Sequence, residues 1–177
     1  WYFDPSARLN EHIPSPELYL GYRIGTHHTR YDRMTTYFEL LDEISDRTEL
    51  HVVGLTPEYR PQLSLIISSK ENIQKLDDIR RRHLSFSTGE GTADPAETPL
   101  IIQLGYNVHG NEASAGEAAL LTAYYLTASD APEVKEWLEK AVILIEPVLN
   151  PDGRDRFASW VNMHKGSPTV AHPYDRE

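Results

Sequence analysis

The chain has no cysteine among its 177 residues. Without thiols it can form no disulfide bond, and a thiolate metal site is excluded as well. Any metal ion would therefore have to be bound by nitrogen and oxygen ligands, which histidine and the acidic residues supply.

An excess of positive charge is also missing. Seventeen Lys and Arg stand against 27 Asp and Glu, which gives a formal net charge of −10 and a pI near 5.2. Nucleic acids and anionic membranes both favour a basic surface, so neither is an expected partner. No apolar run approaches the length of a membrane span, and no span is predicted. Apolar residues at 40% and charged residues at 25% are typical of a globular domain.

The start of the chain lacks the features of a leader. It begins at Trp1 without Met and without a basic segment followed by an apolar one, which favours a trimmed or mature chain. Residues 1–30 are irregular, aromatic and rich in proline. They predict an extended arm that lies over a domain formed by residues 31–177.

The first half of that domain shows a helix followed by strands. Met34, Phe38 and Leu41 recur on one face of a predicted helix over residues 31–45. Two short strands, residues 49–55 and 62–68, flank a proline-bounded turn and predict an antiparallel pair near a sheet edge. Capping-box spacing at Ser68 and Glu71 predicts a helix that ends at residue 83. The polar segment 85–98 predicts a surface loop.

The second half predicts a crossover unit. A buried strand at 99–104, a helix of small residues at 113–128, a short helix at 132–140 and a very apolar strand at 141–149 follow one another. Strands joined in this way must be parallel neighbours in one sheet. The chain is therefore predicted to be an α/β protein.

A candidate metal site follows the first strand of this unit. The strand leads into residues 106–112 (YNVHGNE), where His109 and Glu112 lie three residues apart. An imidazole and a carboxylate at that spacing can bind one cation from a single turn. Open α/β sheets place ligands beyond the carboxyl ends of their strands. Alternatively, Asn111 and Glu112 serve only as the start of a helix, but that interpretation leaves His109 unexplained.

A second motif, Asn-Pro-Asp-Gly at residues 150–153, follows the last strand. Taken alone, this sequence is a good turn and needs no other function. Because both motifs follow strands joined by a crossover, they are expected to lie side by side at one edge of the sheet.

Together, these two motifs and the elements between them resemble the zinc metallocarboxypeptidases related to carboxypeptidase A, over residues 31–160. The resemblance implies a three-layer α/β/α fold with a mixed, mostly parallel sheet. It also implies that His109 and Glu112 are the first and second zinc ligands. The activity implied is hydrolysis of the C-terminal peptide bond of a peptide or protein by a zinc-activated water. Frequent secretion in that family favours a secreted or periplasmic location.

The chain departs from that family's pattern because it stops before the third ligand and the general-base glutamate. The resemblance therefore implies the N-terminal portion of a catalytic domain, which binds zinc weakly and lacks peptidase activity on its own. His164 and His172 lie in a polar segment without a preceding strand and are not expected to bind metal. Arg154 and Arg156 are expected to pair with Asp152 or Asp155 at the surface rather than to stabilise an oxyanion.

Two alternatives stay open from the sequence. One is a carboxypeptidase-like binding module without chemistry, which holds a peptide or a partner protein. The other is a zinc deacylase or amidase with the same metal-binding loop. Neither a Gly-x-Ser-x-Gly nucleophile turn nor a glycine-rich phosphate loop is present in the sequence.

Overall fold

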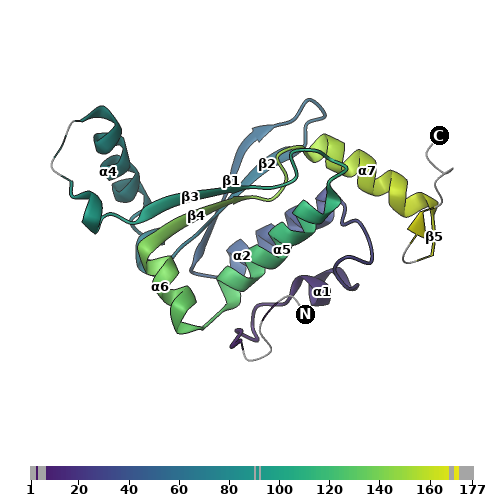
Figure 1. The fold of residues 1–177 in the computed structure, drawn as a ribbon, viewed down its shortest axis with the longest axis horizontal. Helices are drawn as coiled ribbons and strands as arrows, with labels where there is room; N and C mark the ends of the chain where they lie inside the picture. Colours follow the sequence, from purple (N-terminus) through teal and green to yellow (C-terminus); the bar gives the residue numbers. More distant parts are fainter. Residues whose placement is uncertain (1–2, 4–6, 90, 92, 168–169, 172–177) are drawn as a thin grey trace.

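A computed structural model of the chain describes residues 3, 7–89, 91, 93–167 and 170–171. Figure 1 shows the arrangement of its helices and strands. In chain order they are α1 (Pro16–Leu20), α2 (Tyr31–Ile44), β1 (Thr48–Leu55), β2 (Pro61–Ile67), α3 (Lys70–Ile73), α4 (Leu76–Thr88), η1 (Pro95–Glu97), β3 (Leu100–Gly105), α5 (Ala113–Ala128), α6 (Pro132–Lys140), β4 (Ala141–Glu146), α7 (Pro151–His164), β5 (Lys165–Ser167) and β6 (Val170–Ala171).

The main sheet has the strand order β1-β2-β4-β3. The predicted α/β class and mixed sheet are confirmed, and the relatives described below share this fold. The parallel part is smaller than expected in the described residues, because only β3 and β4 pair in parallel. β1 and β2 are joined by a short turn and must run antiparallel, and β2 also pairs antiparallel with β4.

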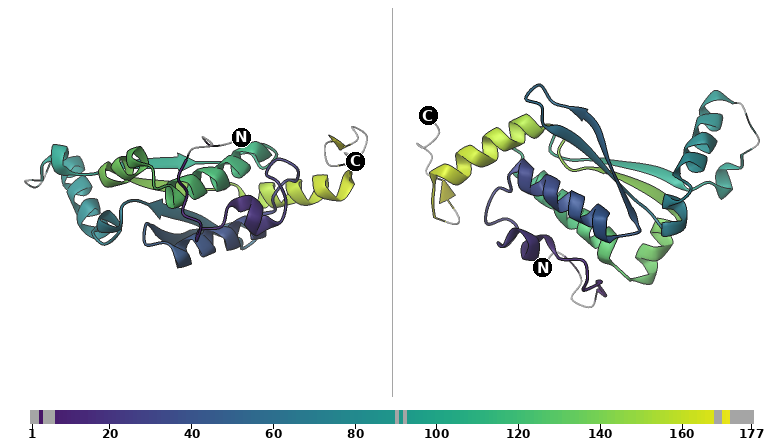
Figure 2. Two further views of the ribbon diagram at one scale, coloured as in Figure 1. Left: turned by 90° about the horizontal axis from the view of Figure 1, so that it is seen from below. Right: turned by 180° about the vertical axis from the view of Figure 1, so that it is seen from behind.

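The hydrophobic core lies between one face of this sheet and helices α2 and α5. The two helices lie side by side in the front and back views (Figures 1 and 2) and contact β1, β2 and β4. Leu63, Leu65 and Ile67 alternate along β2, so all three point to the face that the helices cover. Ala119 and Ala123 of α5 are fully buried. Their small side chains allow the helix to approach the sheet closely.

The N-terminal arm packs against the helices. Asn10 N donates to the Ala128 carbonyl at the end of α5. The short helix α1 is capped by the Ser15 hydroxyl, which accepts from Leu18 N, and Leu20 is buried. The division of the chain into an arm of residues 1–30 and a domain of residues 31–177 stays a prediction.

The segment after β2 differs from its prediction in two ways. Ser69, and not Ser68, caps the helix, because the Ser68 hydroxyl instead donates to carbonyls of Leu138 and Ala141. The predicted single helix is also broken into α3 and α4, and α4 continues through residues expected to form a loop. It ends at Gly89, whose left-handed φ of 70° is a common helix stop. α4 projects from the body of the molecule in Figure 1.

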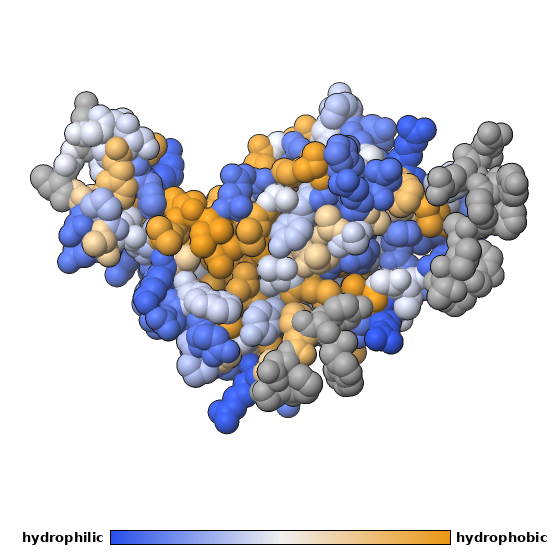
Figure 3. All heavy atoms as spheres, in the orientation of Figure 1, coloured by the Kyte–Doolittle hydropathy of each residue, from blue (hydrophilic) through white to orange (hydrophobic). Residues whose placement is uncertain are grey.

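The prediction of a buried β3 is wrong, because none of its residues is buried and only Leu104 is partly covered. Leu100, Ile101 and Ile102 expose 63%, 44% and 39% of their surface. β3 is the last strand of the sheet as described, with β4 as its neighbour. Figure 3 shows apolar side chains gathered on this part of the surface. An apolar run predicts a strand, but it does not distinguish an edge strand from a central one.

Candidate metal site

The two sequence motifs lie side by side at the edge where β3 and β4 end. Beyond the strands, Tyr106 N donates to the Glu146 carbonyl over 2.9 Å, and Leu149 N donates to the Tyr106 carbonyl over 2.9 Å. Asn150 N then reaches the Asn107 carbonyl at 3.3 Å. The parallel pairing thus continues as backbone contacts between the two loops, which confirms the predicted neighbourhood.

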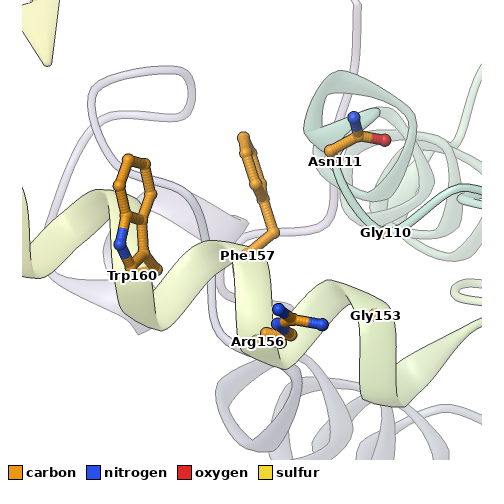
Figure 4. A pocket seen from close by; sticks show the side chains of 6 residues that line it. All are labelled: Gly110, Asn111, Gly153, Arg156, Phe157 and Trp160. Carbon is orange, nitrogen blue, oxygen red and sulfur yellow. The ribbon is translucent and has the colours of Figure 1, made fainter. Parts of the chain in front are cut away.

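Two glycines set how closely these loops approach. A Cβ atom placed on Gly110 would lie 2.0 Å from the carbonyl carbon of Gly153. Backbone therefore packs directly on backbone, in space that no side chain could share. Figure 4 shows the two glycines at this junction.

The candidate ligands His109 and Glu112 face each other across one turn. His109 Nδ1 lies 3.1 Å from Glu112 Oε2, and the side chains are 71% and 61% exposed. Glu112 N donates to the His109 carbonyl, which closes the turn just before α5. In the described part of the chain, neither side chain has a second polar partner. Both remain accessible to an ion.

This donor pair fits a zinc ion in chemistry and in spacing. Imidazole nitrogen and carboxylate oxygen are common zinc ligands, and two donors bound tetrahedrally to one Zn²⁺ would be about 3.3 Å apart. The observed 3.1 Å is close to that separation. The pair thus meets the requirement for two positions of a zinc site.

No group of three or more His, Asp or Glu that could hold a metal occurs within the described residues. His164 is engaged elsewhere, since its Nδ1 donates to the Trp160 carbonyl and its ring lies 4.8 Å from the Trp160 ring. His172 lies outside the described residues.

Asn107 supports the turn and was not singled out by sequence reasoning. It adopts a positive φ of 53°, a conformation that asparagine tolerates better than most residues. Its Nδ2 donates to the carbonyls of His109 and Glu112 over 2.6 and 3.2 Å. One amide group therefore bonds both residues of the candidate pair through their backbone.

The second motif has a structural role at its first residue. The Asn150 side chain caps α7 by accepting from Gly153 N over 3.0 Å, and Pro151 occupies the first helical position, where its missing N–H costs nothing.

Asp152 connects the second motif to the turn between β1 and β2. Its carboxylate accepts from Thr56 Oγ1 at 2.7 Å, Arg60 Nη1 at 2.8 Å and Glu58 N at 3.3 Å. Loss of solvent alone would raise the pKa of the Asp152 carboxyl, but these hydrogen bonds outweigh it and hold the pKa below its usual value. The motif thus fixes the hairpin turn beside the candidate site.

Of the two arginines that follow this motif, Arg154 is buried and Arg156 is exposed. Arg154 was expected to pair at the surface, and this prediction is wrong, because Arg154 is fully buried against Glu117. Arg60, from the hairpin turn, pairs with both Asp152 and Asp155, and Arg30 Nε lies 3.9 Å from Asp155 Oδ1.

Arg156 is exposed on α7, and no ion pair joins it to other described residues. With Phe157 and Trp160 it lines a hollow of about 630 Å³ beside Gly110 and Asn111 (Figure 4). The hollow borders the turn that carries the candidate ligands.

Comparison with known proteins places the chain in a family. The profile of the zinc carboxypeptidases, peptidase family M14, matches residues 34–175. The chain belongs to the zinc carboxypeptidase family. It is 29% identical over 130 residues to carboxypeptidase D of Mus musculus, and the match covers 72% of this chain and 8% of the mouse protein.

Two solved structures illustrate the fold that this chain shares with known proteins. Thrombin activatable fibrinolysis inhibitor matches with a TM-score of 0.52 and 16% identity, over 74% of this chain and 27% of that one. A metallo-carboxypeptidase from Burkholderia cenocepacia matches with a TM-score of 0.50 and 14% identity, over 72% and 28%. The chain thus spans less than a third of each of these proteins. No helix in the described part combines the length and apolar character needed to cross a bilayer.

Proposed function

We propose that this chain forms the zinc-binding part of a carboxypeptidase catalytic domain, with His109 and Glu112 as two zinc ligands. The substrate would be the C-terminal end of a peptide or protein. The observation that carries the proposal is the 3.1 Å approach of two exposed side chains, without other polar partners in the described chain, at the carboxyl edge of parallel strands.

The protein's part in the chemistry follows from the charge of this pair. His109 would bind zinc as a neutral imidazole and Glu112 as a carboxylate, so the pair would offset only one of the two positive charges of Zn²⁺. The chemistry supplied by the metal would be polarisation of a substrate carbonyl and a lower pKa of a bound water. The hollow lined by Phe157 and Trp160 gives a peptide room beside these ligands.

We expect the isolated chain to bind zinc weakly and to lack peptidase activity. Structural sites with four ligands bind with about 10–16 kcal/mol. Two of four donors would supply roughly half of that, about 5–8 kcal/mol, which corresponds to a dissociation constant of about 1–200 μM. A tight stoichiometric site or an active preparation would contradict this expectation.

Calorimetric titration of the chain with zinc chloride at neutral pH tests the ligand assignment. His109→Ala and Glu112→Gln should each weaken binding at least about tenfold, since each removes one of two donors. His51→Ala is a matched control, because His51 Nε2 lies 2.8 Å from Glu49 Oε1 in another exposed pair, in the middle of β1. Equal losses in the control and in His109→Ala would show that any exposed histidine–carboxylate pair suffices, and the assignment would fail.

A non-catalytic binding module is the second candidate, because the hollow beside Phe157 and Trp160 has room for a peptide whether or not a metal is bound. Peptide binding that is unaffected by zinc and by His109→Ala would support it. A zinc deacylase or amidase would instead require an acylated substrate. A secreted or periplasmic location stays a prediction.

A further inference from the structure

A buried arginine lies directly behind the candidate metal-binding turn. Arg154 of α7 is fully buried, and its guanidinium makes five hydrogen bonds. Nε and Nη2 both donate to the Thr29 carbonyl, over 2.9 and 2.8 Å. Because a guanidinium has five N–H groups, this environment satisfies all of its donors.

Glu117 of α5 supplies the opposite charge. Its Oε1 accepts from Arg154 Nη2 at 2.5 Å and from Thr29 N at 2.7 Å, and its Oε2 accepts from the Thr29 hydroxyl at 2.7 Å. Glu117 is 6% exposed. A buried arginine is tolerated only when its charge is paired and its donors are bonded, and both conditions hold here.

The remaining guanidinium nitrogen reaches both ends of the metal-binding turn. Arg154 Nη1 donates to Asn107 Oδ1 over 3.1 Å and to the Ala113 carbonyl over 2.6 Å. These residues immediately precede and follow the segment 108–112. Gly116 leaves space for this contact, because a Cβ atom there would lie 2.8 Å from Arg154 Nη1.

The arginine also determines which way the Asn107 amide points. A guanidinium can only donate hydrogen bonds, so it must face the amide oxygen of Asn107. The NH₂ group is then turned toward the carbonyls of His109 and Glu112, where it donates to both. Arg154 thus acts on the two candidate ligands through Asn107.

We propose that Arg154 is a positioning residue for the metal-binding turn, held in place by Glu117 and acting through Asn107. Its effect on zinc rests on the proposed function, whereas its effect on the turn does not. A lysine could keep the charge beside Glu117, but its three donors on one nitrogen could not span Thr29, Asn107 and Ala113 together.

Two variants and two measurements test this role. Arg154→Lys keeps the charge, and Asn107→Asp keeps an acceptor for Arg154 but removes the donors to the two carbonyls. Amide hydrogen exchange followed by NMR should become about tenfold faster in residues 107–115 of both variants, with β2 and β4 unchanged. Zinc affinity by calorimetry should fall by about 10–100-fold, as for other groups that orient metal ligands. Arg81→Lys, at an exposed position of α4, is the control that should alter neither quantity.

The outcomes separate positioning from general support of the fold. Unchanged exchange in residues 107–115 would overturn the proposal, and so would an increase of equal size throughout β2 and β4. If Arg154→Lys does not fold, the exchange rates of Asn107→Asp alone decide whether the turn is positioned through Asn107, because this variant leaves the pair of Arg154 and Glu117 in place. If the unmodified chain binds no zinc, the proposed metal site fails, and the exchange data still decide whether Arg154 positions the turn.

Discussion

Replacing Gly110 with alanine tests the backbone contact on which the site's geometry depends. The added Cβ atom would lie 2.0 Å from the carbonyl carbon of Gly153, 2.3 Å from its oxygen and 2.5 Å from Arg154 N. All three atoms belong to backbone, so no rotamer change can relieve the overlap. The two loops would have to separate by about 1.4 Å to restore an ordinary contact of 3.4 Å.

The cost of that separation can be worked out from its parts. Overpacking in a well-packed region costs about 1–3 kcal/mol. Opening the loops would also break the hydrogen bond from Asn150 N to the Asn107 carbonyl, which adds about 1 kcal/mol. We expect the free energy of unfolding to fall by about 2–4 kcal/mol. For a chain of this size the unfolding midpoint should drop by about 5–15 °C.

Thermal unfolding followed by circular dichroism measures this drop. Gly54→Ala is a suitable control, because the nearest atom to its new Cβ would be the flexible side-chain oxygen of Gln62 at 3.3 Å. That change should shift stability by less than about 1 kcal/mol. If Gly110→Ala unfolds at the same temperature as the unmodified chain, the two loops do not touch as described. The prediction that the two motifs lie side by side would then be refuted.

Two further predictions concern alkaline pH and the exposed strand. Burial raises the pKa of Tyr31 to about 12 and holds that of Tyr37 well above its usual value, so their contribution to stability is complete below pH 10 and is lost as pH rises through these folded-state values. In a titration at 295 nm they should ionise only after the other tyrosines, together with unfolding by circular dichroism; full ionisation near pH 10 in a folded chain would contradict this. Exposed apolar residues on an edge strand favour pairing with another chain, so we expect the unmodified chain to self-associate at high concentration and Leu100→Lys, which adds a charge there, to reduce that association in light scattering. Leu18→Lys, at an exposed position of α1, should have a smaller effect, and equal effects would show that the strand edge is not responsible.

The proximity of the two motifs could be predicted because its determinants are local. An apolar run ending in His109 marks the end of one strand, and Asn150 with Pro151 marks the end of another. A crossover between them forces parallel pairing, and parallel strands end at the same edge. No long-range information was needed to place the two motifs together.

The exposure of β3 and the length of α4 could not be predicted in the same way. Whether Leu100 is covered depends on which strand lies beside it, and its own sequence does not contain that information. Residues 85–88 carry serine and threonine, which weakly disfavour a helix, yet their hydroxyls bond to carbonyls one turn earlier and the helix continues to Gly89. The end of α4 is therefore indicated better by the left-handed Gly89 than by the polar composition of the residues before it.

The sequence contains an indication that Arg154 is buried, although its chain neighbours suggest otherwise. Arg154 has Asp152 and Asp155 as chain neighbours, and that proximity favoured surface pairing, although its actual partners lie 37, 41, 47 and 125 residues away. The signal was in α5, where Glu117 is the only charged residue in a helix of small and apolar side chains. A lone carboxylate on a helix expected to pack against a sheet needs a buried cation, because an unpaired charge there would be too costly. Arg154 satisfies that need from behind the turn that carries His109 and Glu112. The need of the Glu117 carboxylate for a buried cation therefore indicates the partner of Arg154 better than the nearness of Asp152 and Asp155 in the sequence.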